Sequence, residues 1–243
     1  QNPLGSAAGY GNSFPLDREE TTRLMGFGTL KYNSIAAQMS RGRTERSLAF
    51  AMASVAGTLN KLAADCCLFS GPDYGFMDFP ESLTTGSSIM PHKKNPDVWE
   101  LVRARCNVIE GLPNQITLVC TNLTHGYHRD FQMIKDLLFP AIDSLFECLG
   151  MTVLMISQMR VNQAIFEDER YDLLFTVESV NRLVLEGVPF RDAYRRVAGS
   201  LRDGSYKVQK NIKHTHTGSI GDPANEKIRE KMEQALSRIL NKD

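Results

Sequence analysis

Apolar residues recur in alternating steps of four and three along residues 43–68. They are Leu48, Met52, Val55, Leu59, Leu62 and Cys66. This spacing keeps the side chains on one face of a helix, so it predicts an amphipathic helix over 43–68. Gly71 and Pro72 follow and are expected to end it.

A second long stripe lies in residues 130–160, and its members are Ile134, Leu138, Ala141, Leu145, Cys148, Thr152, Met155 and Met159. Pro140 is expected to kink the helix that this stripe predicts. A helix of this length with a continuous heptad stripe has to pack against other long helices. The pattern therefore indicates a bundle of long helices.

Shorter helices are predicted elsewhere, at 18–26, 96–113, 171–186, 190–203 and 225–241. Asp17 suits the N-cap of the first, and Pro96 suits the first turn of the second. No strand alternation and no internal repeat is found. We therefore expect an all-α fold, with a central helical bundle domain over 1–168 and a small C-terminal helical domain over 169–243.

Three segments carry loop composition, namely 1–15, 71–95 and 204–224. The first contains Gly5, Gly9 and Gly11, but no strand pattern precedes them, which argues against a nucleotide-binding turn. The segment 71–95 has no helical stripe. A loop of that length inside a domain is usually functional, so the chemistry is sought there.

Composition narrows the class of protein. The 243 residues include 28 basic and 28 acidic side chains, a balance that gives no electrostatic footprint for nucleic acid or an anionic membrane. No apolar run is expected to approach the ~18 residues of a membrane span. The five cysteines form no CxxC pair and sit among apolar neighbours, so we expect reduced core thiols in a cytoplasmic protein. His214 and His216 lack a third ligand, and no metal site is expected.

The long loop ends in the segment 84–97, TTGSSIMPHKKNPD. Gly86 allows close approach of the backbone to a ligand, and Ser87 and Ser88 add two hydroxyls. Two lysines, an amide and a predicted helix N-terminus follow. Together these groups would make a site for an anion that gathers charge during a reaction. On spacing alone, a solvated polar loop that merely starts a helix is the favoured interpretation.

The segment 86–96, GSSIMPHKKNP, resembles the signature GSSxMPxKxN of the fumarase/aspartase superfamily at every fixed position. The resemblance implies an all-α homotetramer that cleaves C–N or C–O bonds and releases fumarate. Within the superfamily, the segment 93–97, KKNPD, is similar to that of argininosuccinate lyases, and so is the block 127–135. The resemblance covers most of 4–200 and begins in the middle of the family's sequence. It implies that the family's N-terminal domain would precede Gln1.

The resemblance also implies roles for residues. Ser87 would be the catalytic base that removes a proton from the succinyl carbon, with Ser88 beside it in the binding site. Lys93 and Asn95 would stabilise the dianionic intermediate, and Glu100 would orient or polarise groups in the site. A free serine hydroxyl is a poor base, so its surroundings must favour the alkoxide.

The second block would supply the substrate-binding residues Tyr127, Gln132 and Lys135, of which Lys135 would pair with a substrate carboxylate. Arg43 is a further candidate near the fumarate moiety, with Arg41 as its rival. The sequence departs from the family in two places: His92 stands where Gln is common, and His128 where Asn is usual. His128 is expected to be a loop histidine with a local partner.

The expected reaction is β-elimination of argininosuccinate to arginine and fumarate, without a cofactor. The expected assembly is a homo-oligomer, a tetramer with shared active sites. In the family, a histidine from the N-terminal half acts as the general acid or supports it, and no segment here matches that region. We therefore expect the chain to be inactive alone. Alternatives are an adenylosuccinate lyase or aspartase type of enzyme, or a catalytically silent relative such as the lens crystallins of this family.

Overall fold

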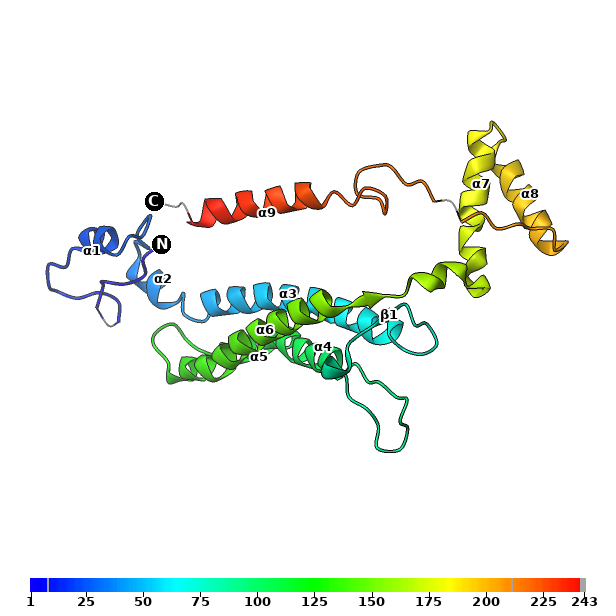
Figure 1. Ribbon diagram of the computed structural model, residues 1–243. Coiled ribbons are helices and arrows are strands. Elements are labelled where there is room, and N and C mark those ends of the chain that lie inside the picture. The colour runs from blue at the N-terminus through cyan, green and yellow to red at the C-terminus, as the bar shows by residue number, and fades with distance from the viewer. Residues whose placement is uncertain (8, 211, 241–243) are drawn as a thin grey trace. The chain divides into compact units, whose positions relative to one another are not determined.

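The computed structural model describes residues 1–7, 9–210 and 212–240 (Figure 1). The chain divides into two compact units, Gln1–Asn162 and Gln163–Asp243. Helices dominate both units, which confirms the all-α prediction. Regular sheet in the described residues is limited to two short strands, β1 (Met77–Asp78) and β2 (Arg160–Val161), which pair antiparallel. The domain boundary at residue 168 stays a prediction.

Four helices form the bundle of the first unit: α3 (Arg43–Phe69), α4 (Asp97–Glu110), α5 (Leu112–Val119) and α6 (Met133–Gln158). α3 and α4 run antiparallel, and Asn60 on α3 donates to Asn107 (2.6 Å) and to Glu110 (2.9 Å) on α4. α6 packs against both of these helices, and α5 packs against α3 and α6. The two long stripes predicted from the sequence thus both lie in helices of one bundle.

The buried face of α3 is centred one residue away from the predicted stripe. Ala49, Ala56 and Ala63 are 0% exposed, whereas Leu48 and Val55 are 43% and 42% exposed. The alanines recur every seven residues, and their small side chains let neighbouring helices approach closely. The predicted helix is correct, but the predicted inward positions of Leu48 and Val55 are wrong.

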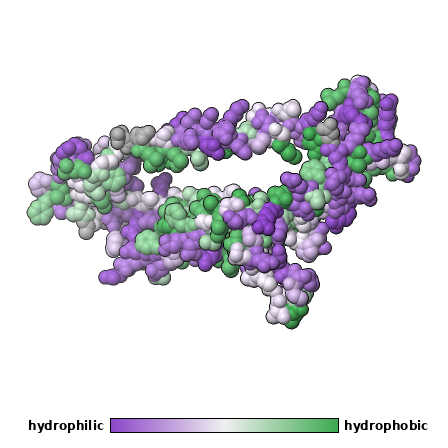
Figure 2. Space-filling model, in the orientation of Figure 1, coloured by the Kyte–Doolittle hydropathy of each residue, from purple (hydrophilic) through white to green (hydrophobic). Residues whose placement is uncertain are grey.

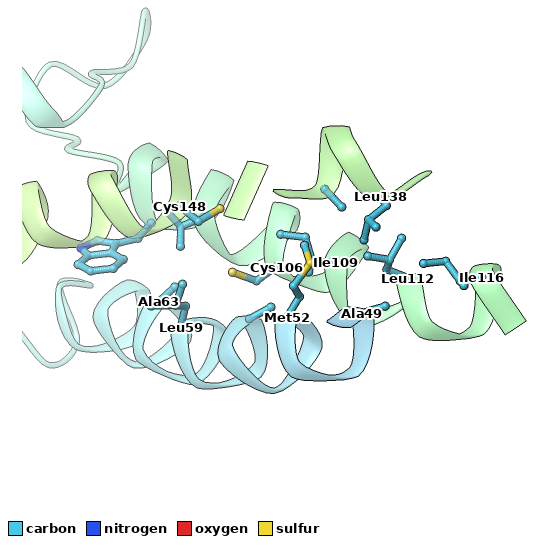
Figure 3. Close-up of a cluster of buried hydrophobic side chains, with 14 of the residues drawn as sticks. Ala49, Met52, Leu59, Ala63, Cys106, Ile109, Leu112, Ile116, Leu138 and Cys148 are labelled. Carbon is cyan, nitrogen blue, oxygen red and sulfur yellow. The ribbon is translucent and has the colours of Figure 1, made fainter. Parts of the chain in front are cut away.

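The core lies between α3, α4, α5 and α6. Figure 3 shows Met52 and Leu59 of α3 facing Cys106 and Ile109 of α4. The only tryptophan, Trp99, is 0% exposed and meets the ring of Phe79 edge-on, with centroids 6.1 Å apart. All five cysteines are free thiols, and Cys66, Cys106 and Cys148 are buried, as expected of core thiols.

The helix predicted over 96–113 is in fact two helices. α4 ends at Glu110, Gly111 follows, and α5 begins at Leu112. Pro113 was expected to stop the helix but lies in the first turn of α5, where its missing N–H costs nothing. α6 continues through Pro140 as one unbroken helix.

Two short helices precede the bundle, α1 (Arg18–Leu24) and α2 (Ser34–Gln38). The Asp17 side chain caps α1 by accepting from the Glu20 amide at 2.8 Å, as the sequence predicts. The guanidinium of Arg18 donates to the carbonyls of Leu4 (3.2 Å), Lys31 (2.9 Å) and Tyr32 (2.8 Å). These bonds tie the N-terminal loop to the segment between the two helices.

The second unit contains the 3-10 helices η3 (Gln163–Glu167) and η4 (Glu169–Phe175), followed by α7 (Thr176–Leu185), α8 (Phe190–Arg202) and α9 (Asn225–Leu240). The helix predicted over 171–186 therefore begins as 3-10 helix. Val180, Ala193 and Val197 form a small core between α7 and α8. The segment after α8 is held to α7 by side chains, including a His214–Glu178 contact of 2.9 Å.

By length and composition, the helical stretch Arg129–Gln158 could cross a membrane, since an 18-residue window in it has a mean hydropathy of 1.6. The expectation that no apolar stretch approaches this length is therefore wrong on this measure, although the stretch contains Asp143 and Glu147. In the bundle, the stripe of Ile134, Leu138, Cys148 and Met155 is buried. A helix packed within a soluble core passes the same length and composition test.

Candidate functional site

The segment with the superfamily signature forms a closed loop between β1 and α4. At its neck, Thr85 and Asn95 pair as an isolated antiparallel bridge. The Thr85 amide donates to the Asn95 carbonyl at 3.2 Å, and the Asn95 amide donates to the Thr85 carbonyl at 2.8 Å. Ser87 and Lys93 each lie two residues inside the bridge, and there the pairing gives way to a turn, in which the Lys93 amide donates to the Met90 carbonyl at 3.0 Å. Figure 1 shows the loop projecting from the bundle.

Ser87 sits in a tight turn inside the loop. Its hydroxyl oxygen accepts from the amides of Ile89 (3.3 Å) and Met90 (3.1 Å). The side chain is half-buried, whereas Ser88 is exposed. Two amide donors directed at one oxygen favour negative charge on that oxygen. The turn therefore provides what the sequence analysis required of a serine base.

The cation and the amide of the motif lie on the returning strand of the loop. Asn95 donates through its side chain to the Gly86 carbonyl at 3.3 Å, so it faces the glycine before Ser87. Within the described residues, the Lys93 ammonium has no hydrogen bond or ion pair. Lys94 instead lies 3.9 Å from the carboxylate of Asp78 in β1. Lys93 is thus the free cation of the pair.

The loop leads directly into the N-terminus of α4. Asp97 is the first residue of that helix, and its carboxylate accepts a hydrogen bond from the Thr85 hydroxyl. Glu100 lies one turn further on and is exposed. Because Asn60 of α3 meets Asn107 and Glu110 across the antiparallel pair, Glu100 lies close to the C-terminal end of α3.

A second group of candidate residues lies around the N-terminal end of α3. Gly42 precedes this helix, and a Cβ built on it would lie 2.5 Å from the Cys120 sulfur and 3.2 Å from the Phe131 ring. Tyr127, Gln132 and Lys135 belong to the segment around Phe131, and all three side chains are exposed.

The structure distinguishes the two candidate arginines by their partners. Arg41 forms an ion pair with Glu45 at 2.9 Å. The same Glu45 carboxylate accepts from the Gly42 amide at 2.9 Å, which satisfies one of the free amides at the start of α3. Among the described residues, the Arg43 guanidinium has no hydrogen bond or ion pair.

The candidate residues therefore form two groups that one chain does not bring together. Ser87, Ser88, Lys93, Asn95 and Glu100 lie at one end of the bundle. Arg43, Tyr127, Gln132 and Lys135 lie at the other. α3 has 27 residues and spans about 40 Å at 1.5 Å per residue, which sets the scale of the separation.

Two histidines near the second block have local partners. The Nε2 atom of His128 lies 2.8 Å from the Thr124 carbonyl, as expected of a loop histidine with a local partner. The His125 ring lies at a tilt near the Tyr10 ring, with centroids 5.8 Å apart, so the N-terminal loop contacts the segment just before the second block. Within the described ranges, no group of three histidine, cysteine or acidic residues is placed to hold a metal ion.

Sequence reasoning did not assign a role to Thr85 or to the side chain of Asp97. Both lie directly beside the signature segment 86–96, and the motif fixes neither as a functional position. Only the bridge between Thr85 and Asn95 shows that Thr85 and Asp97 meet across the neck. Their separation of twelve residues in the sequence does not by itself predict that they are in contact.

Comparison with known proteins agrees with this geometry. The family model described as lyase matches residues 1–111. Argininosuccinate lyases from Parabacteroides distasonis and Phocaeicola vulgatus are 54% and 52% identical over 236 residues, 97% of this chain and 53% of each relative. A solved structure of EDDS lyase in complex with formate superposes with a TM-score of 0.66 at 27% identity, covering 83% of this chain and 41% of that one.

The helical bundle and the loop with its serine, lysine and asparagine define a lyase of the fumarase/aspartase type. Within that class, the chain is homologous to argininosuccinate lyases along nearly its whole length. The chain spans about half the length of the curated relatives it matches, and the match lies in their C-terminal part.

Proposed function

We propose that this chain forms the C-terminal part of an argininosuccinate lyase of arginine biosynthesis, which eliminates fumarate from argininosuccinate and releases arginine. The observation that carries the proposal is the geometry of the signature loop. It directs two amides at the Ser87 oxygen and leaves the Lys93 ammonium unpaired among the described residues. The identity of about one half to curated argininosuccinate lyases supports the choice of substrate.

Ser87 is the proposed base. Its oxygen takes a proton from the succinyl carbon next to a carboxylate, and the electron pair left behind is delocalised into that carboxylate. The amides of Ile89 and Met90 already donate to this oxygen and so favour the alkoxide that the step requires. The carbon–nitrogen bond then breaks, the electron pair forms the double bond of fumarate, and arginine leaves after its nitrogen is protonated.

Lys93 and Asn95 are the proposed electrostatic partners of the intermediate. The carboxylate gains a second negative charge when the proton leaves, and a preorganised cation and amide stabilise that charge more than they stabilise the ground state. The positive end of α4 follows within two residues of Asn95 and acts in the same direction. Glu100 and Ser88 complete the proposed loop side of the site.

Arg43, Tyr127, Gln132 and Lys135 are the proposed substrate-binding residues, and they would serve the site of a neighbouring subunit. Their distance from the Ser87 loop rules out a common cavity within one bundle. Arg43 is preferred over Arg41 because Arg41 already pairs with Glu45. The general acid is expected from the N-terminal half of the whole enzyme, and the reaction as proposed needs no metal or cofactor.

We propose a homotetramer with shared active sites, and the separation of the two residue groups supports the sharing between subunits. Phe139, Phe146 and Val153 of α6 recur every seven residues and are 58%, 70% and 70% exposed. Figure 2 shows hydrophobic residues on the surface of the bundle. A heptad stripe of large apolar residues is the pattern of a helix that packs against another helix, here one from a second copy. Burial on both sides would explain the apolar composition of α6 in a soluble, cytoplasmic enzyme.

The test is fumarate release by the full-length protein, followed by ultraviolet absorbance. Argininosuccinate is compared with adenylosuccinate and aspartate. We expect turnover of argininosuccinate and its loss in Ser87→Ala. The matched control is Ser82→Ala, which removes an exposed serine of the same long loop and should leave turnover unchanged. Preference for another substrate, full activity of Ser87→Ala, or a folded tetramer without turnover would each overturn the proposal.

The isolated chain gives a second arm of the test. Purified residues 1–243 should release no fumarate, because the general acid and part of the bundle are expected to come from the N-terminal half. Adding that half, produced separately, should restore turnover if the two parts assemble. Activity of the chain alone would show that it contains its own general acid.

A further inference from the structure

The neck of the catalytic loop is joined by one side-chain bond in addition to its two backbone bonds. The Thr85 hydroxyl donates to the carboxylate of Asp97, across the bridge between Thr85 and Asn95. Both Thr85 and Gly86 are exposed to solvent, so water competes for the backbone bonds of the bridge. The side-chain bond is charge-assisted, which makes it stronger than a neutral hydrogen bond.

The position of Asp97 gives this bond a mechanical role. Asp97 begins α4, and two residues later Trp99 is fully buried in the bundle core, followed by Val102. The first turn of α4 is therefore fixed to the core of the protein. The bond from Thr85 connects the incoming strand of the loop to that fixed point.

The register of the neck decides where the reactive side chains lie. Ser87 and Lys93 each stand two residues inside the bridge of Thr85 with Asn95. The turn with Ser87 and the segment with Lys93 both extend from this bridge, so a slip of one residue at the neck would shift one of them along the chain relative to the other. Such a slip would separate the Ser87 oxygen from the cation and amide that are proposed to act with it.

We propose that Thr85 and Asp97 are positioning residues, whose hydroxyl–carboxylate bond holds the register of the loop so that Ser87 and Lys93 face the same substrate. The inference rests on the proposed lyase function and goes beyond it, because neither residue has to touch the substrate. Thr85 acts through Ser87, and Asp97 acts through Thr85.

The experiment compares Thr85→Val with Thr84→Val in the full-length protein. Valine keeps the branched shape and removes the hydroxyl in both variants. The Thr84 hydroxyl makes only contacts of 3.4 Å with the Pro80 and Glu81 carbonyls, outside the neck. For Thr85→Val we expect kcat to fall about tenfold to a hundredfold with KM within about twofold, the loss expected for a bond to a charged group. Thr84→Val should behave as the wild type.

Two further variants separate positioning from general damage. Thr85→Ser restores the hydroxyl and should bring kcat back towards the wild-type value. The double variant Thr85→Val/Asp97→Ala should be no slower than Asp97→Ala alone, because both changes remove the same bond. Additive losses, a rise in KM alone, or failure of serine to rescue would overturn the proposal.

Amide hydrogen exchange in residues 86–95 of the chain itself gives a readout that needs no activity. Thr85→Val should speed exchange of the Asn95 amide relative to Thr84→Val, since the bridge opens more often. Equal exchange in the two variants would refute the positioning role even if the enzyme is active. A wild-type protein without turnover would refute the proposed function instead, and the exchange result would still decide the role of the bond.

Discussion

Gly42 is the position where a single added methyl group should have the largest effect on the N-terminal end of α3. Its φ is +81°, in the left-handed region, and its amide donates to the Glu45 carboxylate at 2.9 Å. A Cβ at this position would lie 2.5 Å from the Cys120 sulfur and 3.2 Å from the Phe131 ring. Gly42→Ala therefore combines backbone strain with a collision in a packed region.

The magnitude follows from these two contributions. A left-handed conformation costs an alanine about 1–2 kcal/mol more than a glycine. Overpacking that moves neighbouring side chains costs roughly 1–3 kcal/mol. Together they predict that Gly42→Ala lowers the free energy of unfolding of the first unit by about 2–5 kcal/mol. Gly26→Ala is the matched control, because Gly26 has φ +69° and nothing within 4 Å of its Cβ position.

The fluorescence of Trp99 in urea is the assay. Trp99 is the single tryptophan of the chain and is buried in the bundle, so its signal reports the first unit rather than the second. The double variant Gly42→Ala/Cys120→Ala should be more stable than the sum of its single changes predicts, because the sulfur that the methyl group meets is gone. If Gly42→Ala and Gly26→Ala lower stability equally, the collision argument is wrong.

Three other outcomes can be checked. Arg43→Ala should lower fumarate release by the whole enzyme more than Arg41→Ala, which removes only the surface pair with Glu45; equal kinetics would remove Arg43 from the site. Burial raises the pKa of Cys106 to about 12, so its thiol stays protonated in the fold. The contribution of this shift to the free energy of unfolding is complete below about pH 8.5 and is lost as the pH rises towards 12. The free energy of unfolding measured in urea should therefore fall less steeply between pH 8 and 10 in Cys106→Ala than in the wild type. Ala63→Leu, at a fully buried helix contact, should cost about 1–3 kcal/mol in the same urea assay, and a neutral result would contradict close packing there.

The sequence determined the elements whose physics is local. Steps of four and three specify a helix face, so the two long helices were predicted within a few residues of α3 and α6. Asp17 specified a helix start, because a side-chain cap needs only its neighbouring amides. The break at Gly111 was not predicted, because a proline that ends one helix and a proline in the first turn of the next look the same in the sequence.

The sequence also predicted the chemistry of the signature segment, because its residues are contiguous and do not depend on distant contacts. The amides that meet the Ser87 oxygen come from the two residues after Ser88, within the same turn. Local spacing could therefore suggest an anion site. It could not exclude a solvated polar loop, and the family resemblance made that choice.

Tertiary structure alone decided how the parts are placed. Periodicity predicted an apolar face on α3 but not the residues at its centre. Ala49, Ala56 and Ala63 are buried because their small side chains allow the helices to pack closely, whereas the larger Leu48 and Val55 are exposed. The length of α3 separates Arg43 from the Ser87 loop, although both were predicted to be site residues. Pairing across the neck brought Thr85 to Asp97. Faces and caps follow from neighbours a few residues apart, whereas these placements depend on how whole helices pack and how far they extend.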